Sequence, residues 1–336
     1  MSHDKKSGRI LQYDKLVIAV GAEPASGMEQ IPGAAEYAIP FYSIEDSYRV
    51  KKAIRESRMK EQPIVRVVVV GGSYAGVELS CNLATELGGK GVGNVEVSLA
   101  SNSEVLSAAA PPNREAGVRR LKESGVRVLT QTRVAEVKGG GVVVLTGPND
   151  ETSTSGEEIP SDLLIWTAGS QPSSLLASLD VDKDPRGRVK VDRRLQLVGA
   201  RGGAATEAAD VYGVGDIATV EGLDLPCNAQ VALQQSDYVA YNIWADYAGR
   251  KPIDFRFVDL GEMMNLGGLD GSITALGNRV KLTGKAAGLA RRAVYAVRMP
   301  TNTQRFRAAA SAAAGTAFSV TNAIIDKGLD IIDRVK

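Results

Sequence analysis

Hydrophobic residues recur along the chain as short uninterrupted runs that end in glycine. The clearest run covers residues 66–70, which read RVVVV, and it leads directly into GGSYAG. Continuous β-branched runs of this kind suit parallel strands that are buried on both faces. The pattern predicts a strand over 66–70, a turn at the glycines, a helix from Val77 to about Leu87, and a further strand from Val95 to Ala100.

Further along the chain, alternating and polar stretches predict other elements. A charged helix is expected from about Ile44 to Lys60, and strands are expected over 126–137 and 142–146, on either side of three consecutive glycines. The polar segment 148–158 reads as an exposed loop, because it lacks apolar periodicity and contains Pro, Gly and Ser.

One strand pattern occurs twice, once before and once after the glycine turn. It consists of four mostly apolar residues, a small residue, glycine and a following proline, and it reads LVIAVGAEP at 16–24 and LIWTAGSQP at 164–172. A third strand, VYGVGDIA at 211–218, ends in Gly215–Asp216. The repetition indicates one dinucleotide-binding fold inserted within another. We expect an outer domain at 1–62 and 171–250, an inner nucleotide domain at 63–170, and a C-terminal region at 251–336.

The glycine turn carries the chemistry of phosphate binding. Against the fingerprint GxGxxG it reads G-x-S-x-x-G: an early glycine permits a tight turn, a late one permits close helix-to-strand contact, and serine stands where the pyrophosphate approaches. The helix that follows offers free N–H groups and a positive dipole end to that phosphate. A glycine-rich turn in another α/β fold is the alternative. The residues are Gly71, Gly72, Ser73, Tyr74, Ala75 and Gly76.

The next strand ends in Ser101, where an acid would read the ribose 2′-hydroxyl of NAD. Without that carboxylate a 2′-phosphate meets no repulsion at this position. The sequence therefore permits NADPH as well as NADH.

Composition narrows the chemistry. The 336 residues are 44% hydrophobic and 24% charged, with a net charge of +1, so nothing global points to nucleic acid. The two cysteines, Cys81 and Cys227, form no CxxC pair, and His3 is the only histidine. This composition argues against a disulfide framework, a metal site and a histidine base. The first residues, MSHDKKSGR, lack the apolar segment of a signal peptide.

In this order the motifs resemble a known family. YDKLVIAVGAEP, VVVVGGSYAGVEL, LIWTAGSQP and VYGVGDIA are similar to the two-dinucleotide-fold flavoprotein reductases. AQVALQQS at 229–236 resembles the AQxAxQQG signature of type II NAD(P)H:quinone dehydrogenases, with Ser236 in place of the last glycine. APPNREAGVRRL and RMPTNTQRF look most like the plastid and cyanobacterial branch.

The resemblance implies an α/β fold with two nested Rossmann-like domains and a C-terminal α+β or helical region that associates with membranes. It also implies FAD, NADPH or NADH, and a prenylated quinone such as plastoquinone or demethylphylloquinone. By the same resemblance the protein would be peripheral on a chloroplast thylakoid membrane or plastoglobule, with a homodimer as one possible state.

The resemblance also assigns candidate site residues. Gln234 and Gln235 would flank the junction of flavin and quinone, or else lie on an exposed polar helix face. Glu78 would contact the nicotinamide side, or else complement the helix dipole. Asp216 would hold a ribityl hydroxyl of FAD, or else cap a helix. Other cofactor-binding positions would be Gly21, Gly169, Gly215, Ala229 and Gln230.

Members of this family carry a further GxGxxG unit ahead of the segment YDKLVIAVGAEP, and residues 1–13 contain none. That unit would bind the FAD pyrophosphate, so weak flavin affinity is expected of the chain as given. The rival hypothesis is a truncated, non-catalytic protein that binds NAD(P)H or associates with membranes.

The C-terminal region is strongly basic, because residues 280–325 contain no Asp or Glu. Apolar residues are interleaved with the basic ones, and a basic amphipathic segment suits an anionic membrane surface. Residues 308–325 are uncharged, yet Ala, Ser and Thr dominate them, which is poor material for a membrane span. The basic residues are Lys281, Lys285, Arg291, Arg292, Arg298, Arg305 and Arg307.

Overall fold

The computed structural model describes residues 2–4, 9–59, 64–87, 94–147, 156–199 and 210–314. The chain forms two compact units, of which the first comprises residues 1–25 and 170–259 and the second comprises 26–169 and 260–336. The second unit therefore interrupts the first, as nested domains do. The boundaries differ from those expected at 62/63 and 250/251, because residues 26–59 and the described C-terminal elements pack within the nucleotide unit.

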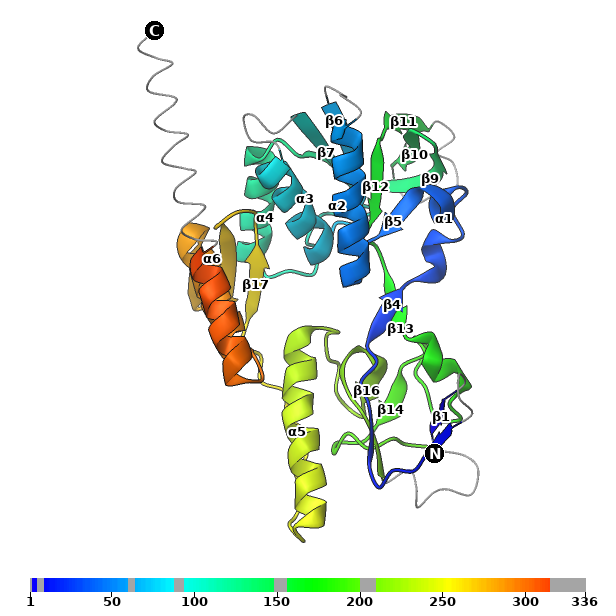
Figure 1. Ribbon diagram of the computed structural model, residues 1–336, viewed down its shortest axis with the longest axis vertical. Helices are drawn as coiled ribbons and strands as arrows, with labels where there is room; N and C mark the ends of the chain where they lie inside the picture. Colours follow the sequence, from blue (N-terminus) through cyan, green and yellow to red (C-terminus); the bar gives the residue numbers. More distant parts are fainter. Residues whose placement is uncertain are drawn as a thin grey trace. The chain divides into compact units, whose positions relative to one another are not determined.

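A five-stranded parallel sheet forms the centre of the second unit (Figure 1). The strand order is β5 (Ala38–Pro40), β12 (Leu163–Trp166), β6 (Ile64–Val70), β7 (Asn94–Ala100) and β8 (Arg127–Leu129). The β5 strand pairs in parallel with β12, from Ala38↔Leu164 to Pro40↔Trp166. This pairing draws the segment before β6 into the nucleotide unit, which local sequence patterns did not indicate.

The alternation of side chains along β6 builds two cores, one on each face of the sheet. Val65, Val67 and Val69 pack with α2 (Ile44–Met59), α3 (Tyr74–Leu87) and α4 (Pro111–Glu123). Val68 and Val70 pack with an antiparallel meander of β9 (Thr132–Lys138), β10 (Gly141–Thr146) and β11 (Glu157–Pro160). Because successive strand residues point to opposite faces, an unbroken valine run fills both cores.

Three local predictions are corrected by the structure. The segment expected as one strand over 126–137 is two strands, because Gln131 has a φ of 49° and turns the chain out of the parallel sheet into the meander. The helix after the glycine turn begins at Tyr74, three residues before Val77. In the expected loop 148–158, residues 157 and 158 belong to β11, while 148–155 lie outside the described residues.

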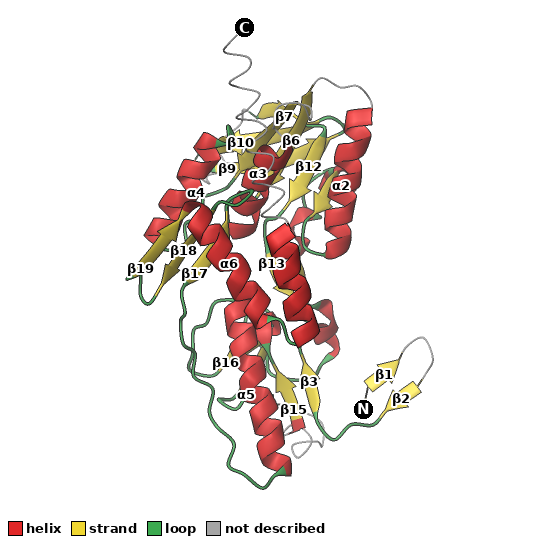
Figure 2. Cartoon of the chain, turned by 60° about the vertical axis from the view of Figure 1, so that its left-hand side comes forward, coloured by secondary structure: helices red, strands yellow, loops and turns green. Residues whose placement is uncertain are grey.

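The C-terminal part of the second unit is a small antiparallel sheet covered by a helix. Its strands are β17 (Glu262–Asn265), β18 (Gly271–Ala275) and β19 (Val280–Thr283), and α6 (Gly284–Arg298) lies along them (Figure 2). On its other side, Met264 and Leu266 join the core beneath α3 and α4. Residues 302–314 are also helical. Within the described ranges, no helix combines the length and apolarity that crossing a membrane requires.

The first unit consists of short paired strands and one long helix. β3 (Leu16–Ile18) pairs in parallel with β15 (Val211–Gly213), and β14 (Val189–Val191) with β16 (Ala218–Val220), while β4 (Ala22–Pro24) and β13 (Ser170–Pro172) are antiparallel. The long helix α5 (Ala229–Tyr247) packs by an edge-on contact of Tyr238 with Phe255, with ring centroids 5.1 Å apart. The remaining elements of this unit are β1 (Ser2–Asp4), β2 (Arg9–Leu11), η2 (Ser174–Ser178) and η4 (Gly215–Ile217), whereas η1 (Ser26–Met28) and α1 (Ala34–Tyr37) belong to the second unit.

Candidate functional site

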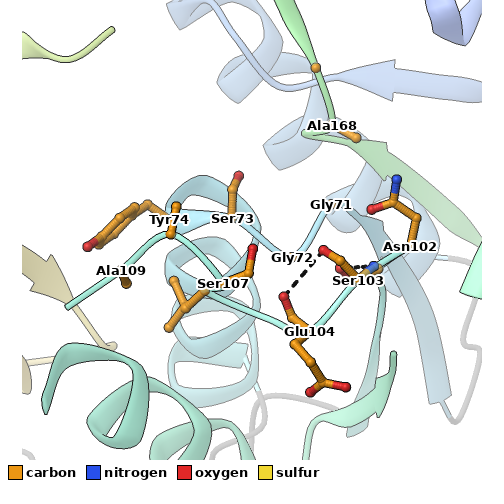
Figure 3. Close-up of a pocket in the computed structure, with 14 residues that line it drawn as sticks. Gly71, Gly72, Ser73, Tyr74, Asn102, Ser103, Glu104, Ser107, Ala109 and Ala168 are labelled. Atoms are coloured by element: carbon orange, nitrogen blue, oxygen red, sulfur yellow. Dashed lines mark hydrogen bonds between the residues drawn. The ribbon is translucent and has the colours of Figure 1, made fainter. Parts of the chain in front are cut away.

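A cavity of about 260 Å³ opens at the carboxyl ends of three neighbouring parallel strands (Figure 3). Residues 71–74 follow β6, residues 101–104 follow β7, and residues 168–169 follow β12, and all of them line it. The chain runs from β6 to β7 on one side, whereas β12 returns on the other side of β6. The cavity therefore lies at the switch point of the sheet, where open α/β folds bind their ligands.

The glycine turn is required by the packing of α3 against the sheet. A Cβ atom on Gly76 would lie 1.7 Å from the carbonyl oxygen of Gly71. Gly71 itself has a φ of 120°, and a Cβ there would lie 2.6 Å from Thr167 Oγ1. Ser73 is exposed in the cavity at the start of the helix, whose first N–H groups have no intrahelical partner. This end of α3 therefore offers hydrogen-bond donors and positive dipole to a phosphate.

Ser101 follows β7 and lines the cavity, at the position where an acid would read the ribose of NAD. It is 4% exposed, its Oγ accepts the Ser103 N–H at 3.4 Å, and a Cβ on Gly72 would lie 2.3 Å from that oxygen. The residue therefore packs closely against Gly72 of the turn. Glu104, which no sequence motif indicated, is exposed and is the only charged residue among the fourteen described residues that line the cavity. Its position in the loop directly after β7 was the feature of the sequence that could have identified it as a lining residue.

Glu78 does not line the cavity. Its carboxylate accepts the backbone N–H of Asn265 in β17 at 2.8 Å, and burial raises its pKa against the opposing charge of Arg291. The structure thus places Glu78 in the packing of α3 on the C-terminal sheet. Tyr74, one turn earlier on the same helix face, donates its hydroxyl to Glu262 in that strand.

The end of β15 in the first unit presents the carboxylate of Asp216. Asp216 is half-buried, and no side-chain or backbone donor within the described residues bonds to its carboxylate; burial alone raises its pKa. The preceding Gly215 has a φ of 75°, and its N–H donates to Gln235 Oε1 at 2.6 Å. A carboxylate in this position can accept hydrogen bonds from the hydroxyl groups of a ribityl chain, so the residues present are compatible with FAD.

The two glutamines of α5 are held by different contacts. Gln235 is 1% exposed, so it does not lie on an exposed helix face. Gln234 donates to the Val258 carbonyl at 2.9 Å and accepts the Val258 N–H at 3.0 Å. Ala229 and Gln230 form the first turn of α5, where Asn228 accepts the Val231 N–H at 2.9 Å as a cap.

The candidate residues divide between the two units. The glycine turn, Ser101, Glu78 and Gly169 belong to the second unit, whereas Gly21, Gly215, Asp216 and the first turns of α5 belong to the first. Gly21 lies where β3 gives way to β4, and its carbonyl accepts the Ser173 N–H at 3.3 Å.

A parallel sheet with a glycine turn at its switch point, inserted into the first unit with its Gly–Asp strand end, defines a two-dinucleotide-fold oxidoreductase. The sequence matches the pyridine nucleotide-disulphide oxidoreductase family over residues 1–236, and the chain belongs to that family, within its FAD-dependent NAD(P)H:quinone branch. The resemblance inferred from the motifs and the α/β fold class are thereby confirmed. This family uses FAD and NAD(P)H.

Curated relatives include the demethylphylloquinone reductase NdbB of Synechocystis, 32% identical over 306 residues that cover 90% of this chain and 70% of the relative. The alternative NAD(P)H-ubiquinone oxidoreductase C1 of Arabidopsis thaliana, chloroplastic and mitochondrial, is 32% identical over 322 residues. That match covers 90% of this chain and 59% of the relative, so the chain spans only part of its relatives' length.

Among solved structures, NDH2 from Plasmodium falciparum in complex with NADH has a TM-score of 0.75 at 16% identity, covering 91% of this chain and 78% of that one. The sulfide:quinone oxidoreductase of Aquifex aeolicus has a TM-score of 0.66 at 18% identity, over 86% of this chain and 69% of that one. At these identities the similarity establishes the fold.

Proposed function

We propose that this protein is a flavin-dependent NAD(P)H:quinone oxidoreductase that acts on a prenylated quinone of the plastoquinone or demethylphylloquinone type. The observation that carries the proposal is the cavity at the switch point of the parallel sheet, built by a glycine turn that admits no Cβ. When bound, FAD supplies the redox chemistry: it accepts hydride from the reduced nicotinamide and passes the electrons to a quinone. The chain's own residues bind and orient the reactants.

In this proposal the turn from Gly71 to Gly76 receives the pyrophosphate of NADH or NADPH on the first N–H groups of α3. Asp216 accepts hydrogen bonds from the ribityl hydroxyls, and Gln235 fixes the Gly215 backbone beside it. Gln234 orders the chain at Val258 near the start of α5. Both glutamines would then flank the place where flavin and quinone meet.

The surface of α6 supports a peripheral association with a membrane. Leu289, Val294, Tyr295 and Val297 are between 42% and 70% exposed on this helix. Exposed basic residues lie among them or close by in the chain, namely Lys281, Lys285, Arg298 and Arg307. An amphipathic basic helix of this kind binds anionic lipid surfaces by charge and by apolar burial. A plastid membrane, either the thylakoid or the plastoglobule surface, is the location we propose from the relatives' names.

The test is to mix the purified chain with FAD and to follow oxidation of NADH and NADPH with a short-chain quinone. Bleaching of the flavin absorbance by NAD(P)H under anaerobic conditions, followed by its return on adding quinone, would support the proposal. Asp216→Ala should reduce retained flavin and leave nucleotide binding intact, because the two sites lie in different units. Nucleotide binding with no flavin retained under any condition would favour a non-catalytic nucleotide-binding protein.

A further inference from the structure

Glu262, the first residue of β17, receives three hydrogen bonds on a single carboxylate oxygen. The Tyr74 hydroxyl donates to Oε2, as do the Ala110 N–H at 2.9 Å and the Asn113 Nδ2 group at 3.2 Å. Glu262 does not line the nucleotide cavity. Its importance comes from two of its donors: Tyr74 lines that cavity, and Ala110 directly follows the lining residue Ala109.

Tyr74 belongs to the wall formed by the glycine turn: it follows Ser73, begins α3, and lines the cavity. Ala110 follows Ala109, the last lining residue of the loop after β7, and is the N-cap residue of α4. The Glu262 carboxylate thus bonds, from outside the cavity, to the glycine turn and to the end of the loop after β7. Figure 3 shows Tyr74 and Ala109 on the same side of the turn.

The carboxylate is backed by a buried polar network. Asn113 is fully buried, its Oδ1 accepts from the Ser272 hydroxyl at 2.6 Å, and its Nδ2 also donates to Thr274 Oγ1 at 3.0 Å. Ser272 and Thr274 lie in β18, so the network reaches into the second strand of the C-terminal sheet. Buried networks whose members are all paired hold one geometry rigidly. Burial, and then the bond to Glu262, raise the pKa of Tyr74, so its phenol keeps its proton across the neutral range.

We infer that Glu262 is a positioning residue for nucleotide binding: through Tyr74 and Ala110 it fixes the glycine turn relative to the loop after β7, and these two segments line the cavity that receives the cofactor. The inference rests on the proposed function, because it takes NADH or NADPH as the ligand of the cavity. It makes the C-terminal sheet part of the nucleotide site, although no residue of that sheet lines the cavity. When the residues that support a binding site are removed, its groups shift by about an ångström, and the site then loses much of its affinity.

The test measures NADH affinity of the full chain by fluorescence titration, well below the unfolding midpoint of each variant. Tyr74→Phe keeps the ring packing and removes the hydroxyl, so we expect affinity to fall roughly three- to tenfold. Glu262→Ala should reduce NADH affinity at least as much. Glu262→Gln should retain most of the wild-type affinity, because the glutamine amide oxygen still accepts hydrogen bonds from the same donors. The double variant Tyr74→Phe/Glu262→Ala should bind no worse than Glu262→Ala.

Tyr48→Phe and Glu115→Ala are matched controls, because both side chains are exposed on helices away from the cavity. Wild-type affinity in both Tyr74→Phe and Glu262→Ala, or fully additive losses in the double variant, would overturn the inference and leave the proposed function standing. Equal losses in Glu262→Gln and Glu262→Ala would also overturn it. If Glu262→Ala fails to fold, Tyr74→Phe and Glu262→Gln decide the matter. Failure of the wild-type chain to bind either nucleotide would instead remove the proposed function, and this inference with it.

Discussion

At the scale of single residues, the site depends on glycines, because a Cβ atom at Gly71 or Gly76 would overlap neighbouring atoms. Gly76 allows α3 to touch the sheet, and Gly71 allows the chain to turn at the strand end. Ser101 is small and buried, so it supports the turn from below. Residue type here is set by available space, and the chemistry is supplied by backbone N–H groups.

We therefore expect Gly76→Ala to destabilise the protein by about 3 kcal/mol, because its methyl group would overlap the Gly71 carbonyl and overpacking against backbone cannot relax locally. Thermal unfolding measures this loss, and NADH titration should show a matching loss of binding. Gly27→Ala is the matched control, since a Cβ there meets nothing within 4 Å. Equal stability of both variants would contradict the packing argument.

The cavity also makes a prediction about cofactor choice. Among the described residues that line the cavity, Glu104 alone is charged, so a 2′-phosphate bound there would face its carboxylate and no cation from this set. Removing that charge with Glu104→Gln should raise NADPH affinity roughly two- to fivefold, since exposed charges interact by about 1 kcal/mol at close range. NADH affinity should stay near wild type. Parallel titrations at low and high salt check this, and an equal change for both nucleotides would refute it.

Asp216 predicts a pH dependence of stability. Burial raises its pKa above the ordinary 3.8, so the folded state binds the proton more tightly than the unfolded state does. Its contribution to stability is fully present below about pH 3.8 and is lost as pH rises through the raised value. In the flavin-free protein, Asp216→Asn should therefore raise the melting temperature at pH 7, and the gain should shrink as pH falls toward 4. Asp237→Asn, on the exposed face of α5, serves as the control.

At the scale of elements, helices fix the loops that carry the candidate groups. The α5 helix does so through Gln235, whose amide oxygen satisfies the Gly215 N–H in a buried position. The α3 helix holds β17 at two points one turn apart, through Tyr74 and Glu78. These side chains are polar because they bond to the backbone or carboxylate of another element.

Gln235→Leu should cost about 1–3 kcal/mol of unfolding free energy, because it leaves a buried N–H without a partner. Gln234→Leu should cost less than about 1 kcal/mol, since its two bonds to Val258 are made at an exposed position where water can replace them. Denaturant unfolding of the two variants compares them directly. A larger loss in Gln234→Leu would mean that burial does not govern these contacts.

At the scale of the whole molecule, the distribution of charge predicts the surface that meets lipid. The described basic residues near α6 are not equivalent. Arg292 donates to the Gly268 carbonyl at 3.1 Å, and Arg291 stacks on Tyr295 while facing Glu78. These two arginines pack within the C-terminal part, whereas Lys285 and Arg298 are exposed.

Replacing Lys281, Lys285, Arg298 and Arg307 with Gln should weaken pelleting with anionic liposomes and preserve NADH affinity. Each basic residue near such a surface contributes about 1 kcal/mol, and added salt should reduce the binding without abolishing it. An equal number of exposed lysines and arginines changed on α2 and α4 provides the control. Equal binding of wild type to neutral and anionic liposomes would contradict the electrostatic part.

The sequence by itself determined the parts of this protein that depend on local rules. Valine runs predicted the parallel strands, and the glycines of the turn predicted both the strand-to-helix connection and the position of the cavity. The nested order of the two units followed from the repeated strand pattern. The strands and the turn are local features, because side-chain alternation and the steric limits of a turn act over a few residues.

Only the tertiary structure decided which polar side chains face the cavity and which face another element. Glu78 and Tyr74 bond to a strand that lies almost two hundred residues later in the chain. The turn at Gln131 divides one predicted strand into β8 and β9, which belong to different sheets. Residues 38–40 join the parallel sheet by pairing with β12. No local pattern encodes such pairings, because each depends on the shape of a surface that exists only after distant segments have packed together.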